Sequence, residues 1–249
     1  MNTHSFESIT LSEMDKVKLM NRTDQKYWFN SNSLSNLLEM VKEDYFLLHI
    51  KEQNQLPYAT TYFDTENNKM FSAHHNGKLN RFKIRKRSYV NSGISFLEIK
   101  FKSNKGRTIK KRIPSTDKHF IFTDEESQFI DTNTPFKTSE LRPSLGNKFT
   151  RLTLVNKNFK ERCTIDINIE FEVENKIVPL DNLVIVEIKS DGKSTASPLA
   201  LALREKRIKT SGFSKYCVGR SVTDPLLKKN AFKPKIRSIE KVTHTHIYI

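Results

Sequence analysis

Hydrophobic and polar residues alternate along several segments of this 249-residue chain. The clearest segment, NRFKIRKRSY at 80–89, has four cations at every second position: Arg81, Lys83, Arg85 and Arg87. Successive side chains of a β-strand point to opposite faces of a sheet, so a strand here would put all four cations on one face. Like charges repel, so this row needs water, carboxylates or an anionic ligand to offset its charge.

The same alternation recurs in other segments, each of which would have one charged face and one apolar face as a strand. Their polar positions are, in chain order, Arg22, Asp24 and Lys26; Glu98, Lys100 and Lys102; Lys110 and Arg112; Arg151 and Thr153; Arg162, Thr164, Asp166, Asn168 and Glu170; and Glu187 and Lys189. A sheet with one solvated face gives this pattern too, and for a single strand that explanation is the better one. Because every strand repeats the pattern and Arg and Lys predominate, we expect the polar faces to line the interior of a closed barrel.

Other segments predict the elements around this sheet. Helices are expected at 31–45, 196–208 and 214–222, within 115–130, and as a short helix at 66–77 that Gly77 ends. Strands are expected at 57–65, 79–90, 94–102, 107–113, 148–156, 162–173 and 182–190. The rest of 115–145 and the basic segment from Lys228 onward read as loop. About eight strands with short turns and helices at both ends indicate an α+β fold, an antiparallel barrel or sandwich covered by helices.

Composition adds a preference for a partner. Lys and Arg number 43 against 28 Asp and Glu, a formal charge of +15, which favours an anionic partner. Two cysteines, Cys163 and Cys217, are too few for a disulfide framework or a thiolate metal site. No apolar run approaches the roughly 20 residues of a membrane span. The first residues lack the apolar segment of a signal peptide. We therefore expect a cytoplasmic protein without a membrane span in this chain.

The interior charges point to a particular ligand. Arg side chains bind phosphate oxygens with two hydrogen bonds, and Lys adds point charge. A few carboxylates in the same interior would hold Mg²⁺ or Mn²⁺, which then bridges phosphate oxygens. This is the pattern expected for a triphosphate site. A nucleic-acid site would add aromatic residues to the basic face, whereas Phe82 and Phe101 fall on the opposite face, so we expect no nucleic-acid partner.

Six ordered segments carry a resemblance to a known family. They are RTDQKYWF, TTYFDT, HHNGKLNRFKIRKRSY, SFLEIKFKSNKGRTIKKR, LVIVEIKSDG and GFSKYCVG. Together they resemble the VTC domain, the polyphosphate polymerase domain of the triphosphate tunnel metalloenzymes. The resemblance implies an eight-stranded antiparallel β-barrel that forms a tunnel, with helices packed outside and a C-terminal helix closing it. We expect one such domain over residues 1–249, with its core at about 20–220 and a basic tail at 228–249.

The resemblance also implies an activity. The VTC domain transfers the γ-phosphoryl group of ATP to a growing inorganic polyphosphate chain, with Mn²⁺ or Mg²⁺, so ATP and polyphosphate or pyrophosphate are the expected partners. Residues 22–26 read Arg-Thr-Asp-Gln-Lys, not the Glu-x-Glu-x-Lys of thiamine triphosphatases and adenylyl cyclases, which argues against those activities. The chain also lacks the SPX domain and the membrane helices of the eukaryotic complex, which leaves open an unknown membrane or regulatory partner.

Residue roles follow from the matched positions. Eight cations are expected to be catalytic: Lys26, Arg85, Arg87, Lys100, Arg112, Arg151, Lys189 and Lys215. Further substrate contacts are expected from Arg81, Lys83, Arg22 and Arg162 in addition to Lys26. Glu187 is the expected metal ligand, assisted by Glu98 or Glu170.

Several residues have plainer interpretations, and two other functions stay open. Asp64 reads as a turn cap more than as a metal ligand, Asp166 as a partner of an arginine, Tyr62 and Trp28 as packing residues, His74 and His75 as surface residues, and the end of the chain, 244–249, as a disordered tail. One alternative is a triphosphatase on the same fold that hydrolyses tripolyphosphate or nucleoside triphosphates. The other is a non-catalytic polyphosphate-binding module, which the presence of Glu98 and Glu187 argues against.

Overall fold

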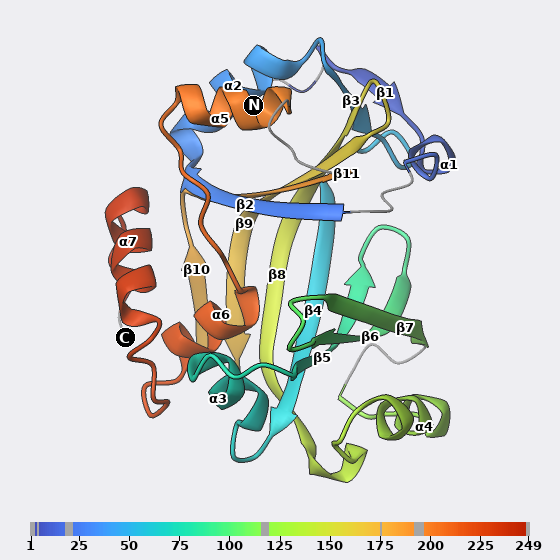
Figure 1. The fold of residues 1–249 in the computed structure, drawn as a ribbon, viewed down its shortest axis with the longest axis vertical. Coiled ribbons are helices and arrows are strands. Elements are labelled where there is room, and N and C mark those ends of the chain that lie inside the picture. The colour runs from blue at the N-terminus through green and yellow to red at the C-terminus, as the bar shows by residue number, and fades with distance from the viewer. Residues whose placement is uncertain are drawn as a thin grey trace.

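A curved antiparallel sheet dominates the computed structural model, which describes residues 3, 5–17, 22–115, 120–174, 176–191 and 197–247 (Figure 1). Eight strands form its hydrogen-bonded path in the order β2-β11-β9-β8-β4-β5-β6-β7. They are β2 (Arg22–Asn30), β11 (Leu183–Asp191), β9 (Glu161–Val173), β8 (Leu141–Asn156), β4 (Leu56–Thr65), β5 (Arg81–Tyr89), β6 (Ile94–Lys102) and β7 (Thr108–Ser115). Strands β2 and β7 are the two ends of this path.

Short strands and helices complete the fold. The short strands are β1 (Glu7–Ile9), which pairs in parallel with β3 (Tyr45–Leu48), and β10 (Lys176–Leu180), which pairs with β9. The helices are α1 (Leu11–Met14), α2 (Leu34–Val41), α3 (Lys69–His75), α4 (Asp124–Asn133), α5 (Pro198–Glu205), α6 (Lys215–Thr223) and α7 (Lys233–Thr243), with short 3₁₀ turns at Ser31–Ser33 and Thr138–Glu140. An antiparallel sheet surrounded by helices confirms the fold class expected from the sequence.

Helices cover both faces of the sheet. On the outer face, α2 and α5 pack over the apolar side chains of β2, β8, β9 and β11, and α4 packs over those of β5 and β6. On the inner face, α6 packs against β8, β9 and β10 (Figure 1). The inner face that α6 leaves uncovered carries the charged residues of the alternating pattern.

Most of the expected elements are present. The hairpin of β5 and β6 turns at Gly93, whose φ of +67° suits glycine, and Gly77 follows α3 with a φ of +66°. Strand β8 begins at Leu141 and not at 148, because residues expected to form a loop pair with β4. The helix expected within 115–130 is α4, which begins at Asp124 because Thr123 caps it. Strands β1, β3 and β10 were not expected.

The interpretation of the last residues as loop was wrong. Residues Lys233–Thr243 form helix α7, whose Ile236 and Ile239 are buried. The side-chain amide of Asn30, at the end of β2, donates a hydrogen bond of 2.9 Å to the carbonyl of Val242. Ile247 is buried as well and packs in the same inner cluster as Ile236 and Ile239. No helix among the described residues is long and apolar enough to cross a membrane.

A bulge in β9 changes which side chains face inward. Asn168 adopts a φ of +51°, and the pairing of β8 with β9 shifts register between Lys148 and Thr150. Before the bulge, Asp166 faces the interior; beyond it, Ile169 and Phe171 do, packed in the inner cluster with α6. Glu170 is therefore exposed on the outer face, and the shared face that alternation assigned to Asp166 and Glu170 was wrong.

Candidate active site

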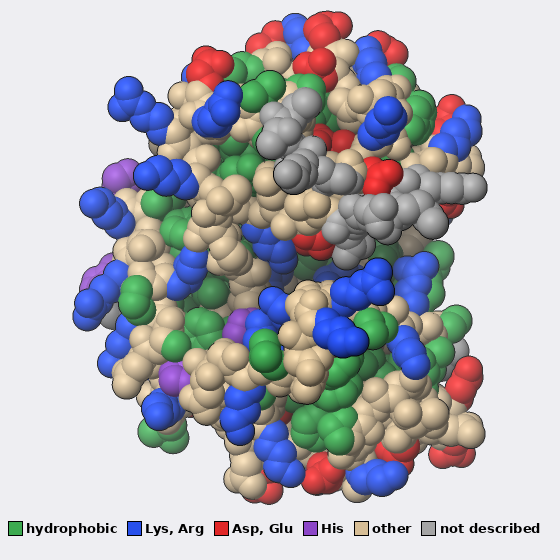
Figure 2. Space-filling view, viewed as in Figure 1, with side chains coloured by type: hydrophobic (Ala, Val, Ile, Leu, Met, Phe, Trp, Pro, Cys, Tyr) green, Lys and Arg blue, Asp and Glu red, His purple; other side chains and the backbone are tan. Residues whose placement is uncertain are grey.

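Charged side chains from seven strands and one helix line the inner face of the sheet. Nine cations are joined there by three carboxylates: Lys26 on β2; Lys83, Arg85 and Arg87 on β5; Glu98 and Lys100 on β6; Lys110 on β7; Arg151 on β8; Asp166 on β9; Glu187 and Lys189 on β11; and Lys215 on α6. Figure 2 shows Lys and Arg side chains in and around a recess between the two halves of the molecule.

Glu98 is the centre of the first group. Its carboxylate accepts hydrogen bonds from Nε of Arg85 at 2.8 Å and from a terminal nitrogen of the same guanidinium at 2.5 Å, and it pairs with Lys110. Arg87 lies 4.0 Å away. Burial by itself would raise the pKa of Glu98, but Arg85, Arg87 and Lys110 hold it well below its usual range. With 0% of its side chain exposed, Glu98 is a buried counter-ion of three cations.

Asp166 joins strand β9 to helix α6. Arg151 donates two hydrogen bonds to its carboxylate, at 2.6 and 2.8 Å, and Lys215 donates a third. These cations overcome the effect of burial and lower the pKa of Asp166. The interpretation of Asp166 as a partner of an arginine is confirmed, and Lys215 is brought from α6 to the charged interior.

Glu187 is the most accessible of the three carboxylates. Lys26 and Lys189 lie 3.5 and 3.2 Å from its oxygens, and 20% of its side chain is exposed. Burial by itself would raise the pKa of Glu187. The net effect is a lowered pKa, because four nearby cations outweigh burial: Lys189, Lys26 and the more distant Lys100 and Arg151. The interaction of Glu187 with Lys100 shows that β11 and β6, which are not neighbours in the sheet, face each other across the interior.

The interior holds more positive charge than its carboxylates balance. Burial, together with neighbouring cations such as Lys26, lowers the pKa of Lys83 to about 8, and burial and Arg85 lower that of Arg87 to about 10. The proximity of Arg85, with burial, lowers the pKa of Lys100 well below its usual value. The surroundings of these cations favour loss of their protons. A bound polyanion would offset this effect, because its negative charge favours their protonated forms.

Buried polar atoms in this region lack partners. Within the part of the chain that the structure describes, no hydrogen-bond partner is present for Nε of Arg87 or for the hydroxyls of Thr60 and Thr164. Thr60 is directly opposite Arg87 on β4, and Thr164 is opposite Glu187 on β9. Buried polar groups are nearly always hydrogen-bonded, so these three atoms indicate room for a polar ligand or water.

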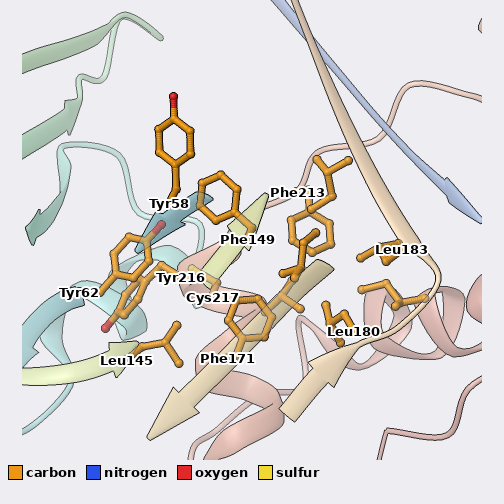
Figure 3. Packing of buried hydrophobic residues seen from close by; sticks show 14 of the residues in the cluster. Tyr58, Tyr62, Leu145, Phe149, Phe171, Leu180, Leu183, Phe213, Tyr216 and Cys217 are labelled. Carbon is orange, nitrogen blue, oxygen red and sulfur yellow. The ribbon is translucent and has the colours of Figure 1, made fainter. Parts of the chain in front are cut away.

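Aromatic residues share the charged face. Tyr58, Tyr62 and Phe149 lie on it and pack in the inner cluster (Figure 3). The guanidinium of Arg151 is 5.0 Å from the Tyr58 ring centre. The phenol of Tyr62 accepts a hydrogen bond of 3.3 Å from Arg85, so this residue contacts the site as well as packing on Tyr216. Phe82 and Phe101 stack on each other on the outer side, as expected, but the charged face also carries aromatic rings, so the argument from aromatic residues against a nucleic-acid partner no longer holds. Tyr58 and Tyr62 alternate along their segment, but their face follows only from contacts with β5: Tyr62 is paired with Arg85, and the guanidinium of Arg87 lies 5.9 Å from the ring centre of Tyr58.

The remaining predicted residues lie at the edges of this region. Arg81 donates to the carbonyl of Lys78 at 2.8 Å, at one end of the row. Arg112 is exposed, with its guanidinium 4.5 Å from the ring centre of Phe96. Arg162 is half-buried opposite Lys189; burial lowers the pKa of that lysine, and Arg151 and Arg162 lower it as well. The side chain of Arg22 is outside the described residues. Lys110, which pairs with Glu98, was not predicted as a site residue.

Two neighbouring residues have other roles. Asp64 is buried, accepts hydrogen bonds of 2.9 Å from the amides of Met70 and Phe71 in α3, and also accepts one from Tyr216. It is thus a helix cap, as the plainer interpretation had it. His74 was predicted to be a surface residue, but it is half-buried, and burial and the nearby Lys83 lower its pKa to about 3.

A divalent cation fits one position in this interior. Among the described residues, no three His, Cys, Asp or Glu side chains gather into a metal cage. Mg²⁺, however, commonly takes one or two carboxylates and completes its coordination with water and substrate phosphates. Glu187 suits that role because part of its carboxylate is exposed, whereas Glu98 is enclosed and Glu170 lies on the outer face.

Comparison with known proteins identifies the family. Residues 21–223 match the VTC domain. The chain belongs to the VTC domain family. No curated protein sequence matches it significantly. This VTC domain is similar in fold to a candidate adenylate cyclase from Bacillus halodurans, with a TM-score of 0.51 and 12% identity over 78% of this chain and 96% of that one.

A second solved structure shares the fold. It is a candidate adenylyl cyclase from Hippeastrum with a dominant triphosphatase activity. Its TM-score is 0.52, with 15% identity over 85% of this chain and 99% of that one. At these identities the two structures show a common fold only. They agree with the tunnel fold expected from the sequence.

Proposed function

We propose that this VTC domain is a polyphosphate polymerase, which transfers the γ-phosphoryl group of ATP to the end of an inorganic polyphosphate chain. One observation carries the proposal: nine cations face three carboxylates in a mostly buried interior. A triphosphate or polyphosphate supplies the negative charge that this interior lacks. The family match supports transfer to phosphate as the reaction.

Positioning and charge neutralisation do most of the work in phosphoryl transfer. Arg85 and Arg151 are held rigidly by two hydrogen bonds each to Glu98 and Asp166, so their remaining nitrogens are oriented before substrate arrives. Arg87, without such a partner at Nε, binds substrate oxygens directly. Lys100 and Lys215 neutralise charge on the transferred group. Removing one preorganised donor of this kind costs about 2.7–4 kcal/mol of transition-state stabilisation.

Glu187 would hold the divalent cation, Mn²⁺ or Mg²⁺, with Lys26 and Lys189 on either side of its carboxylate. The bound cation would neutralise part of the negative charge of the substrate phosphates. Both lysines pair with Glu187 in the protein alone. With a cation on that carboxylate, the two lysines would be close enough to bind the substrate phosphates instead.

The proposal extends to the whole chain. We place a single VTC-like domain over residues 1–249, because α7 packs on the sheet beyond the matched segment. A cytoplasmic location would provide ATP.

Hydrolysis of tripolyphosphate or of a nucleoside triphosphate is the second candidate. It is favoured by the likeness in fold to the Hippeastrum protein, whose dominant activity is a triphosphatase. The same cations would serve, with water in place of the phosphate acceptor.

The product distinguishes the two reactions. Purified protein is incubated with ATP, Mn²⁺ or Mg²⁺ and a small amount of pyrophosphate, and products are separated on a gel stained for polyphosphate while ADP is assayed. A ladder of polyphosphate with one ADP per unit added supports the polymerase. Arg87→Ala should abolish the ladder, whereas Lys148→Ala, which alters an exposed cation of β8, should not. Release of orthophosphate without a ladder overturns the polymerase in favour of the triphosphatase.

A further inference from the structure

A row of aromatic rings runs from the charged interior to its rim. It begins with Phe149 on β8, continues through Tyr58 on β4 and Tyr89 on β5, and ends at Phe96 on β6. The ring centres are 5.2 Å apart from Phe149 to Tyr58, 4.9 Å from Tyr58 to Tyr89, and 6.0 Å from Tyr89 to Phe96. Burial falls along the row: Phe149 and Tyr58 are buried, and Tyr89 and Phe96 are half-buried.

These rings belong to the charged face of each strand. Phe149 is two residues before Arg151, Tyr89 is two after Arg87, and Phe96 is two before Glu98, so alternation puts each ring beside an interior charge. Figure 3 shows Phe149 next to Tyr58 on this inner side. Tyr58 and Phe149 belong to the inner cluster, against which Tyr89 packs, whereas other residues of the same strands build the outer clusters.

An arginine extends the row to the surface. The guanidinium of Arg112 on β7 lies 4.5 Å from the ring centre of Phe96, while the rest of its side chain is exposed. A guanidinium plane lying on an aromatic ring presents its other face to solvent, where a second flat π-system can stack. Tyr89, Phe96 and Arg112 thus form an aromatic, cationic rim, in which the Tyr89 ring meets the Phe96 ring edge-on at 84° and Arg112 lies over the Phe96 ring.

The rim is next to a cation that lacks a partner. Arg87 is directly opposite Phe96 in the pairing of β5 with β6, and its buried Nε has no hydrogen-bond partner among the described residues. A phosphate bound to Arg87 would therefore have its neighbouring groups close to Phe96 and Arg112. If a nucleoside triphosphate binds with its γ-phosphate among the interior cations, the group at the rim is the nucleoside.

We propose that Tyr89, Phe96 and Arg112 form the nucleobase subsite, in which the base stacks on Arg112 above Phe96 while the phosphates extend inward from Arg87. This subsite rests on the proposed use of a nucleoside triphosphate. Arg112 then acts on the base and not as a further phosphate ligand. Stacking uses the π-face that every base has, so adenine and guanine nucleotides bind with similar affinity.

Two substitutions that retain charge test the subsite. Phe96→Leu removes the ring and keeps an apolar side chain, and Arg112→Lys keeps the charge and removes the plane. Binding is measured by titration calorimetry, with a non-hydrolysable ATP analogue and with inorganic tripolyphosphate, which has no base. Each variant should weaken binding of the ATP analogue about tenfold and leave that of tripolyphosphate unchanged.

Phe101→Leu is the matched control. Phe101 is on the same strand as Phe96 but stacks on Phe82 in the outer cluster under α4, with ring centres 4.6 Å apart. It should lower the melting temperature without changing the ratio of the two dissociation constants.

The outcomes separate the subsite from the reaction. If Phe96→Leu and Arg112→Lys change both ligands equally, or change neither, the subsite is overturned. If they weaken only the ATP analogue in a protein that releases orthophosphate and makes no polyphosphate, the subsite stands and the polymerase falls. A wild-type protein that binds tripolyphosphate but not the analogue overturns the subsite.

Discussion

Lys83 donates a hydrogen bond of 2.9 Å to the hydroxyl of Ser214, and this bond joins strand β5 to helix α6. Ser214 is the N-cap of α6 and accepts a hydrogen bond from the amide of Cys217. The next residue, Lys215, pairs with Asp166 in the charged interior. Lys83, one of the four alternating cations of β5, therefore contacts the N-cap of the helix that carries Lys215 to the site.

Binding of tripolyphosphate should weaken above pH 8. The pKa of Lys83 in the free protein is about 8, because burial and neighbouring cations disfavour its charge. A bound polyanion favours the charged form and raises this pKa, so binding takes up a proton at pH values between the free and bound pKa. Affinity should therefore fall as the pH rises above about 8, where Lys83 of the free protein loses its proton. Calorimetry in buffers of different ionisation enthalpy measures the uptake.

Lys83→Arg is the control for that assignment, because a guanidinium stays protonated through this pH range. The variant should retain affinity to about pH 9 or higher. An unchanged pH profile in Lys83→Arg would mean that another group titrates.

Glu98→Gln should destabilise the protein by about 3–5 kcal/mol, because it leaves the buried Arg85 and its neighbouring cations without their carboxylate. Glu172→Gln, which breaks the exposed pair with Lys148 at 3.0 Å, should cost less than about 1 kcal/mol. Urea unfolding of both variants gives the comparison. Equal losses would contradict the view of Glu98 as the central counter-ion.

Asp64→Ala should reduce stability by about 3 kcal/mol or more, since it leaves the amides of Met70 and Phe71 and the hydroxyl of Tyr216 without their acceptor. Tripolyphosphate affinity of the folded variant should be unchanged. A selective loss of metal-dependent binding, with stability retained, would instead restore the metal role that the sequence left open for Asp64.

Ile239→Ala should cost about 2–5 kcal/mol if α7 belongs to the same cooperative unit as the sheet, because its side chain is fully buried. The exposed Lys241 of the same helix provides the control, for which Lys241→Ala should cost less than about 0.5 kcal/mol. Thermal unfolding measured by circular dichroism would show a separate early transition if α7 were an independent appendage.

Alternation predicted the strands and the inner face well, because a residue's side of a regular strand follows from counting. Arg85, Glu98, Arg151 and Glu187 all face inward as the count implies. Counting fails at a bulge: the left-handed backbone at Asn168 sends Glu170 outward, and nothing in INIEF announces it. A bulge depends on pairing with β8, which one strand's sequence does not contain.

Other features depended on contacts between distant segments. Helix α7 has only a few apolar residues among many charges, and the burial of its Ile236 and Ile239 depends on packing in the inner cluster beside β2 and β11. The partner choice of Glu98 was equally hidden: it pairs with Arg85 and Lys110, not with Lys100 on its own strand. Lys100 instead faces Glu187 across the interior.

The fate of the γ-phosphoryl group tests the central claim most directly. ATP labelled with ³²P at the γ position is incubated with the protein, Mn²⁺ and pyrophosphate, and the label in polyphosphate and in orthophosphate is followed over time. The polymerase predicts that most label enters chains that lengthen while ADP accumulates in equal amount. Label that appears in orthophosphate from the start, with none in chains, would contradict it.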